Sequence, residues 1–320
     1  MLRKTPKGTL ILIGGAEDKG DGLSTHRNKN YIELEILRDL LPTEKKSEKS
    51  IEIITTASTI PVEINEMYSQ AFNRLGFKKI GFINMNNNVE ADDPKFVKRI
   101  ENAHCVVFSG GDQFRLSTIL GNSSVVAAVL EKYTVDKDFI VAGTSAGAMA
   151  MSVLMLYRGQ EDEAMLSRAV RFTSGFGFVD GCIIDTHFIK RGRFGRLAQS
   201  VVENPAFIGI GLGEDTALIV KKGNKTECRG SGMVVIMDGQ DVGHTNIAYA
   251  KEDTPICIEN MRVHILTSGN GYLLNERKFV PSKKDLKIEN LSNEKIQLMA
   301  QKKRIAAANE ELAGSKATKK

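Results

Sequence analysis

The chain has 320 residues and a mass of 35.2 kDa, enough to bury a full core in one large domain or two small ones. Its apolar content of 42% and charged content of 26% are ordinary for a soluble globular protein. The net charge of +5 comes from residues 283–320, where ten Lys and Arg stand against five Asp and Glu. The remaining basic and acidic groups balance, so we expect no nucleic-acid-binding surface.

The cysteines and the apolar runs exclude several further classes of protein. Cys105, Cys182, Cys228 and Cys257 lie far apart, without a C-x-x-C pair or a matching histidine cluster. This spacing predicts reduced thiols and no metal site. The first apolar run, residues 10–13, is too short for the core of a signal peptide, and no run reaches membrane-spanning length. We therefore expect a cytoplasmic protein with no cofactor and no membrane contact.

From residue 9 to residue 142, short apolar runs alternate with segments of helical spacing. Continuous apolar strands that alternate with helices are typical of an α/β fold, with a mostly parallel sheet covered by helices on both faces. Such sheets carry their active sites at the carboxyl ends of the strands. The predicted strands are 9–13, 51–55, 79–85, 105–108 and 139–142, and the predicted helices are 31–41, 62–75, 94–103, 115–120 and 124–133.

The last of these strands runs into Gly143-Thr144-Ser145-Ala146-Gly147, which good helix formers follow. Strand, G-x-S-x-G and helix together are the context in which a sharp turn exposes a serine hydroxyl. The two glycines have a steric reason, because a Cβ at either position would meet neighbouring chain in so tight a turn. A glycine-rich turn without catalytic function is the alternative interpretation of the pattern.

After Ser145 the alternation weakens. A strand over 181–188 and a helix over 190–203 come first, and short strands with glycine-rich turns then continue to about residue 280. These short strands predict antiparallel additions to the main sheet. In the tail, an apolar residue recurs every seven positions from Leu291 to Leu312. We expect one catalytic domain over 1–281 and a charged, helical extension with a frayed end over 282–320.

A serine nucleophile needs a base, and the base needs an acid to orient it. Of the five histidines, only His187 closes an apolar strand beside a polar, arginine-rich segment. The candidates for the acid are Glu163, Asp185, Glu214 and Asp215. Asp185 precedes His187 by two residues on the same predicted strand, so it faces the same side and could contact substrate instead.

A second glycine pair follows the strand over 105–108. The backbone amides of Gly110-Gly111-Asp112 could complete an oxyanion hole with the amide of Ala146. A tight turn in which Asp112 caps the next helix is the alternative. We expect the oxyanion hole at Gly111 and Ala146.

Five blocks of polar and glycine residues follow one another along the chain. They are Gly14-Gly15-Ala16-Glu17-Asp18-Lys19, Ser109-Gly110-Gly111-Asp112-Gln113, Gly143-Thr144-Ser145-Ala146-Gly147-Ala148, Asp185-x-His187-Phe188-x-x-Arg191-Gly192-Arg193-x-x-Arg196-Leu197 and Gly211-x-x-Glu214-Asp215-Thr216-Ala217. In order and over roughly residues 8–270, these blocks resemble the cyanophycinase family of serine exopeptidases. The resemblance implies a fold similar to peptidase E and to class I glutamine amidotransferases, and a homodimer. It also implies hydrolysis of cyanophycin, a poly-aspartate with arginine on each β-carboxyl, to β-Asp-Arg dipeptides.

The resemblance also implies roles for single residues. Ser145 matches the nucleophile, His187 the base and Glu214 the acid of a Ser-His-Glu triad. Thr186 stands where the family usually has Gln, and threonine is too short to reach as far. Other positions match the lining of the substrate cleft: Gln113, Asp185, Arg191, Arg193 and Arg196.

Two alternatives stay open beside a cyanophycinase. One is a peptidase acting on another Asp-containing dipeptide or isopeptide, and the other is a non-catalytic binder of Asp/Arg-rich peptides. In a cyanophycinase or a related peptidase, the arginines after His187 suit a substrate carboxylate, which arginine binds bidentately. A solvated helix face, or salt bridges to neighbouring residues, is the alternative interpretation of these arginines. The acidic run 161–163 suits a substrate guanidinium.

Overall fold

The computed structural model describes residues 4–20, 28–42, 49–159 and 165–287. The chain divides into two units, Met1–Phe279 and Val280–Lys320. Most of the predicted helical extension therefore lies outside the described residues.

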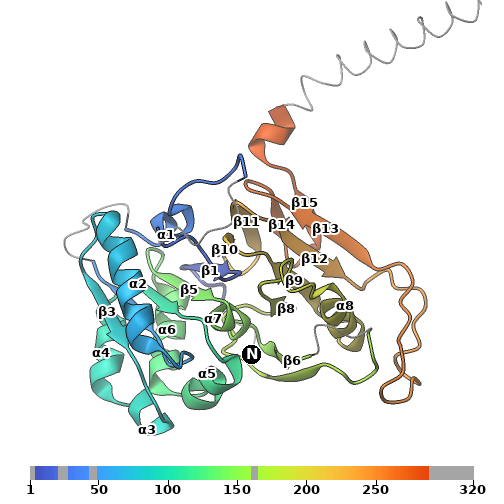
Figure 1. Cartoon of the computed structure of the whole chain (residues 1–320), viewed down its shortest axis with the longest axis horizontal. Helices are drawn as coiled ribbons and strands as arrows, with labels where there is room; N and C mark the ends of the chain where they lie inside the picture. Colours follow the sequence, from blue (N-terminus) through green and yellow to red (C-terminus); the bar gives the residue numbers. More distant parts are fainter. Residues whose placement is uncertain (1–3, 21–27, 43–48, 160–164, 288–320) are drawn as a thin grey trace, which may run out of the picture. The chain divides into compact units, whose positions relative to one another are not determined.

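Secondary structure follows the chain from blue to red in Figure 1. The strands are β1 Thr9–Ile13, β2 Ile51–Ile54, β3 Ile80–Ile83, β4 Cys105–Phe108, β5 Ile140–Thr144, β6 Leu154–Arg158, β7 Arg171–Ser174, β8 Cys182–Asp185, β9 Ile208–Leu212, β10 Thr216–Lys221, β11 Lys225–Gly230, β12 Val234–Asp238, β13 Arg262–Leu266, β14 Gly271–Leu273 and β15 Lys278–Val280. The helices are α1 Glu35–Asp39, α2 Pro61–Arg74, α3 Asn88–Ala91, α4 Pro94–Asn102, α5 Gln113–Leu120, α6 Ser124–Val135, α7 Ala146–Met149 and α8 Phe194–Glu203.

The larger sheet has, within the described residues, the strand order β15-β14-β11-β10-β1-β5-β4-β2-β3. Its centre is parallel, because β1, β5, β4, β2 and β3 pair in the same direction. The added strands β10, β11 and β14 pair antiparallel. The predicted α/β sheet with antiparallel additions is confirmed.

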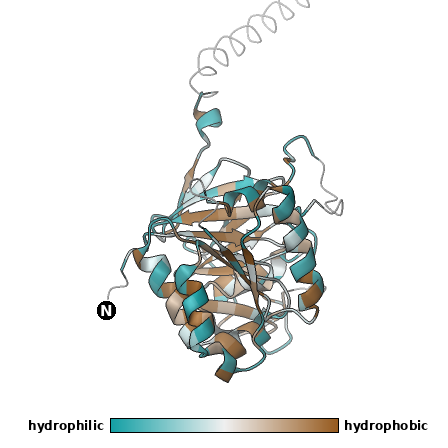
Figure 2. Cartoon of the chain, turned by 90° about the vertical axis from the view of Figure 1, so that its left-hand side faces the viewer, coloured by the Kyte–Doolittle hydropathy of each residue, from teal (hydrophilic) through white to brown (hydrophobic). Residues whose placement is uncertain are grey.

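Both faces of this sheet are covered, as the alternating side chains of β1 illustrate. Ile11 and Ile13 pack with α1 and α2 in one cluster. Leu10 and Leu12 belong to the other cluster, with residues of α4, α5 and α6. Figure 2 shows the apolar strands between helices that turn hydrophilic residues outward. Burial on both faces explains why these strands are continuous apolar runs.

Some of the added strands do not join the main sheet, contrary to expectation. β12 and β13 pair instead with β9 and β8 in a second sheet, ordered β13-β12-β9-β8. Short turns connect strands of one sheet to strands of the other. Next to the turn between β9 and β10, the carbonyl of Thr216 accepts a hydrogen bond from the amide of Gly14. The second sheet matters for function, because the loops after β8 and β9 reach the carboxyl edge of the first.

The first helix is shorter than its apolar spacing predicts. The sequence favours a helix over 31–41, but α1 begins only at Glu35. Asp18 accepts hydrogen bonds from the hydroxyl of Tyr31 and the amide of Leu34. Leu34 also has a left-handed backbone, with φ 55°. These hydrogen bonds hold the residues before Glu35 in turns, so the helix begins later in the chain than predicted.

Register places three predicted loops side by side. In the central strands, Ile13 pairs with Thr144, and Phe108 pairs with Gly143. The chain leaves all three strands at the same edge. The loops that begin at Gly14, Ser109 and Ser145 are therefore neighbours.

Candidate active site

Ser145 lies on the sharp turn between β5 and α7. Its backbone angles are φ 52° and ψ −117°, a conformation that L-residues rarely adopt. A Cβ at Gly143 would lie 2.5 Å from the backbone of Gly147, and one at Gly147 would lie 2.1 Å from the carbonyl of Phe108. The steric reason predicted for the two glycines is confirmed.

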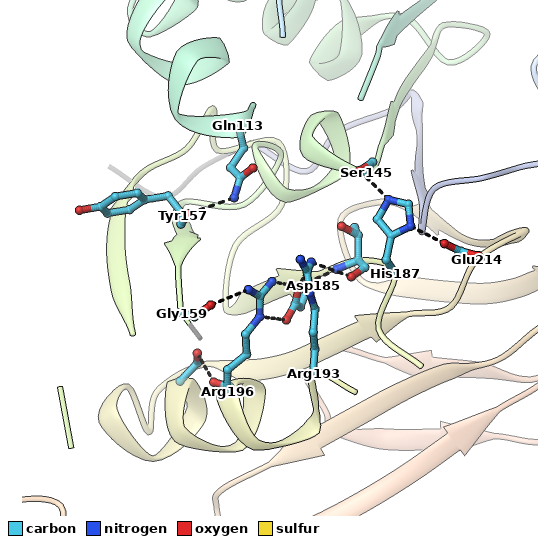
Figure 3. A network of polar contacts seen from close by, with 11 residues as sticks. Gln113, Ser145, Tyr157, Gly159, Asp185, His187, Arg193, Arg196 and Glu214 are labelled. Atoms are coloured by element: carbon cyan, nitrogen blue, oxygen red, sulfur yellow. Dashed lines mark hydrogen bonds and ion pairs between the residues drawn. The ribbon is translucent and has the colours of Figure 1, made fainter. Parts of the chain in front are cut away.

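A continuous chain of hydrogen bonds joins Ser145, His187 and Glu214 (Figure 3). The hydroxyl oxygen of Ser145 lies 2.9 Å from Nε2 of His187. Nδ1 of the same ring lies 2.7 Å from Oε1 of Glu214. An ionised carboxylate can only accept, so Nδ1 donates to it. In the neutral ring Nε2 is then free to accept the serine proton.

His187 reaches Ser145 from the second sheet. The strand predicted over 181–188 ends earlier, because β8 stops at Asp185 and His187 has a left-handed backbone with φ 49°. Its amide donates to the carbonyl of Gly14 at 2.8 Å, which fixes the turn. Gly15 leaves room for the ring, since a Cβ there would lie 2.4 Å from it. The expectation that Asp185 and His187 share one strand face is therefore wrong.

Glu214 follows β9 in the turn before β10, and each of its carboxylate oxygens has a nitrogen neighbour. Oε1 faces His187, and Oε2 lies 3.2 Å from Nζ of Lys190. Only 8% of the Glu214 side chain is exposed, whereas 59% of the Lys190 side chain is. The turn itself is held where the amide of Asp215 donates to the carbonyl of Gly15.

The pKa shifts of this pair favour proton transfer at neutral pH. Burial lowers the pKa of His187 below its ordinary value, and this outweighs the hydrogen bond and the charge of Glu214, which act in the opposite direction. Burial alone would raise the pKa of Glu214, but hydrogen bonds from His187 and Lys190 bring it below the ordinary value. At pH 7 the ring is therefore neutral and the carboxylate ionised, so the ring can accept a proton as a general base.

The other predicted acids lie elsewhere. Asp215 is buried and accepts hydrogen bonds from the hydroxyl of Ser231 at 2.5 Å and the amide of Asp18 at 3.1 Å. Burial raises its pKa. Asp215 thus fastens two loops together and does not face His187 as Glu214 does. Glu163 lies outside the described residues, as does the whole acidic run 161–163.

Asp185 is completely buried, and two of the predicted substrate-binding arginines hold it. Arg196 binds it bidentately, with Nε 2.6 Å from Oδ2 and Nη2 2.5 Å from Oδ1. Nη1 of Arg193 lies 3.1 Å from Oδ1. Both guanidinium groups are nearly inaccessible. Asp185 is thus an anionic partner of both arginines within the chain, where we expected a substrate carboxylate.

Thr186 belongs to the same buried cluster. Its amide donates to Asp185 at 2.8 Å, and its carbonyl accepts from Arg193 at 2.9 Å. The residue is 1% exposed, so its side chain does not line an open cleft. Thr186 and Asp185 therefore support the turn that carries His187, which corrects their expected place in contact with substrate. Arg191 lies at the exposed start of the following turns, and its amide donates to the carbonyl of His187.

The loop after β4 lies against the serine. A Cβ at Gly110 would come within 3.2 Å of Cβ of Ser145. Asp112 caps α5 by accepting from the amides of Phe114 and Arg115, as the alternative interpretation of this turn predicts. This cap is made by the side chain of Asp112 and uses no backbone amide of Gly110 or Gly111.

Gln113 begins α5 on the same loop. Its Nε2 donates to the carbonyl of Tyr157 on β6 at 3.2 Å. Figure 3 shows Gln113 and the Asp185 cluster on one side of the serine and histidine, and Glu214 on the other.

Sequence reasoning missed Glu17, a buried carboxylate beneath the turn. Its Oε2 accepts from the hydroxyl of Thr144 at 2.6 Å, one residue before Ser145. Its Oε1 accepts from Tyr68 at 2.6 Å and pairs with Lys19 at 2.9 Å. Burial alone would raise its pKa, but the charge of Lys19 and these hydrogen bonds lower it below the ordinary value. An acidic residue just after a buried strand was the available signal.

Metal ligands and membrane-spanning helices are both missing from the described residues. In the part of the chain that the structure describes, His, Cys, Asp and Glu nowhere gather in threes that could hold a metal ion. Among the same residues, no helix has the length and apolar content needed to cross a membrane.

Comparison with known proteins gives concordant results. The model of peptidase family S51 matches residues 21–228. The chain is 30% identical over 282 residues to a cyanophycinase of Nostoc sp., covering 87% of this chain and 91% of that protein. It is 29% identical over 271 residues to a cyanophycinase of Geminocystis herdmanii, covering 85% and 95%. A crystal structure of a peptidase from an acI-B1 Actinobacterium has the same fold, with a TM-score of 0.59 at 22% identity, over 85% of this chain and 98% of that one.

Proposed function

The chain belongs to peptidase family S51 and is a serine-type exopeptidase, and we propose that it degrades cyanophycin with Ser145, His187 and Glu214 as its catalytic triad. The observation that carries the proposal is the unbroken hydrogen-bond chain from the serine hydroxyl to the glutamate. Membership in a peptidase family favours an enzyme over a non-catalytic binder.

In the proposed reaction, Ser145 attacks the carbonyl carbon of the scissile bond while Nε2 of His187 takes the hydroxyl proton. The imidazolium then gives this proton to the leaving amine, and an acyl-enzyme forms on Ser145. A water molecule, activated by the same nitrogen, releases the acyl group. Glu214 keeps the ring proton on Nδ1 and stabilises the imidazolium in both steps.

The amides of Gly111 and Ala146 are the proposed donors to the oxyanion. The amide of Ser145 is already engaged, because it donates to the carbonyl of Ile13 at 3.0 Å. The loop containing Gly111 lies beside Ser145, and Ala146 begins the helix that follows it. One such donor contributes about 2.7–4 kcal/mol to catalysis in serine peptidases.

Cyanophycin is the proposed substrate because the relatives that match most of this chain are named cyanophycinases. On this proposal the products are β-Asp-Arg dipeptides. The identity to these relatives is only about 30%, which leaves a peptidase acting on another Asp-containing peptide as the second candidate. The homodimer implied by the resemblance and a cytoplasmic location are further proposals.

The test is the release of dipeptide from purified cyanophycin granules, followed by mass spectrometry of the soluble products. We expect β-Asp-Arg as the main product with the wild type and none with Ser145→Ala. Cleavage of β-Asp dipeptides other than β-Asp-Arg, with cyanophycin left intact, would establish the second candidate. Soluble products longer than one dipeptide at early times would instead contradict exopeptidase action on this polymer.

A further inference from the structure

Each cyanophycin unit carries a free carboxylate, and the two buried arginines already have Asp185 as their partner. Arg193 and Arg196 are almost inaccessible, and Asp185 accepts from both. Using either arginine for substrate would require breaking a buried ion pair, which is strongly unfavourable. A more accessible cation near the triad is a better candidate for binding a substrate carboxylate.

A pocket of about 460 Å³ lies beside Glu214, the acid of the triad. Ile189 and Met233 supply apolar wall, and Ser231 and Thr267 also line the pocket, with their hydroxyls donating to Asp215 and Asn270. In Figure 3, Glu214 lies on the opposite side of His187 from Gln113 and the Asp185 cluster. Hydrogen bonds from Ser145 through His187 to Glu214 connect the nucleophile to this wall of the pocket, so the pocket lies within reach of a peptide unit next to the scissile bond.

Lys190 contributes a cation to the wall of this pocket. Its ammonium lies 3.2 Å from Oε2 of Glu214, while most of the side chain remains exposed. An ammonium has three donors, so it can bind a second carboxylate without leaving Glu214. The contact with Glu214 also holds the cation against the pocket, which reduces the conformational entropy that a ligand must remove.

We propose that this pocket is a substrate subsite, in which Lys190 binds the carboxylate of a peptide unit adjoining the scissile bond. The stem of that unit lies against Ile189 and Met233. The inference rests on the proposed function, because it assumes a peptide with a carboxylate on each unit. It assigns binding of the substrate carboxylate to Lys190, which directly precedes the arginine-rich segment 191–196 that the sequence indicated.

Binding without turnover tests the subsite. Full-length protein carrying Ser145→Ala is titrated calorimetrically with a peptide of three β-Asp-Arg units and with the same peptide amidated at each arginine carboxylate. We expect Lys190→Met to weaken binding of the first peptide by about tenfold to a hundredfold, the factor of one charge-assisted hydrogen bond. The amidated peptide should lose less than about threefold, and Lys190→Arg should restore most of the difference. Lys251→Met, at an exposed lysine that does not line the pocket, is the matched control.

Equal losses for both peptides, or no loss for either, would overturn the subsite. So would a failure of the peptide with free carboxylates to bind. Hydrolysis of the three-unit peptide by protein with Ser145 intact is measured in parallel, and it separates the two proposals. Hydrolysis without the expected binding pattern contradicts the subsite alone. The binding pattern without hydrolysis contradicts the proposed function and leaves the subsite supported.

Discussion

Ser145→Ala should leave the protein folded and lower kcat on cyanophycin by about 10⁶, the scale on which removal of a triad serine acts. The hydroxyl is the group that lies 2.9 Å from the base, and no other atom of the residue is changed. The backbone should tolerate the substitution, because alanine has the same Cβ and therefore meets the same steric limits at φ 52°. Initial rates of dipeptide release measure the effect.

Ser117→Ala is the matched control for this variant. Ser117 lies on α5, and its hydroxyl donates to the carbonyl of Phe114 at 3.0 Å, one turn from the loop beside Ser145. We expect its rate to stay within about twofold of the wild type, and both variants to melt near the wild-type temperature. A folded Ser145→Ala protein that keeps more than a few per cent of activity would show that another group is the nucleophile.

Glu214→Gln should lower kcat by roughly 10⁴, the cost of losing the orienting carboxylate in a serine peptidase triad. An amide can donate to Nδ1 of His187, which places the ring proton on Nε2, where it faces Ser145 and prevents acceptance. The substitution also removes a charge that raises the pKa of His187. As the pH falls, the residual activity should therefore decline at a lower pH than the activity of the wild type does. A pH series of kcat/KM checks both effects.

Two other carboxylates serve as comparisons for Glu214. Asp215→Asn changes the next residue, whose oxygens bind Ser231 and the amide of Asp18, so we expect a lower melting temperature and a far smaller loss in rate. Glu163→Gln should also be mild. If Glu163→Gln were the most damaging of the three, the assignment of the acid would be wrong, although the class of enzyme would stand.

Sequence was sufficient for the parts of this site that depend on strand order. Parallel strands with continuous apolar runs place their following loops at one edge, so the loops at Gly14, Ser109 and Ser145 are neighbours for a reason visible in the apolar pattern alone. The turn at Ser145 was also predictable, because its two glycines have no room for a side chain. These inferences need only the backbone.

Side-chain pairing was not predictable in the same way. Three arginines in six residues suggested a cleft that binds an anionic group of the substrate. Asp185, a residue of the chain itself, is instead the anion that pairs with two of them. Nothing in the spacing distinguishes an arginine that faces solvent from one that turns back onto a preceding strand. The strand end at Asp185 was predicted wrongly for a related reason: the left-handed turn at His187 is fixed by a hydrogen bond to Gly14, far away in sequence.

The most direct test of the proposed mechanism is covalent trapping of the nucleophile with a serine-directed phosphonate. After reaction of the wild type, peptide mapping by mass spectrometry should find one phosphonylated residue, Ser145. Labelling should become much slower in His187→Ala, since the hydroxyl then lacks its base. A wild-type protein that stays unlabelled while it hydrolyses substrate, or that carries the label on a different serine, would contradict the account.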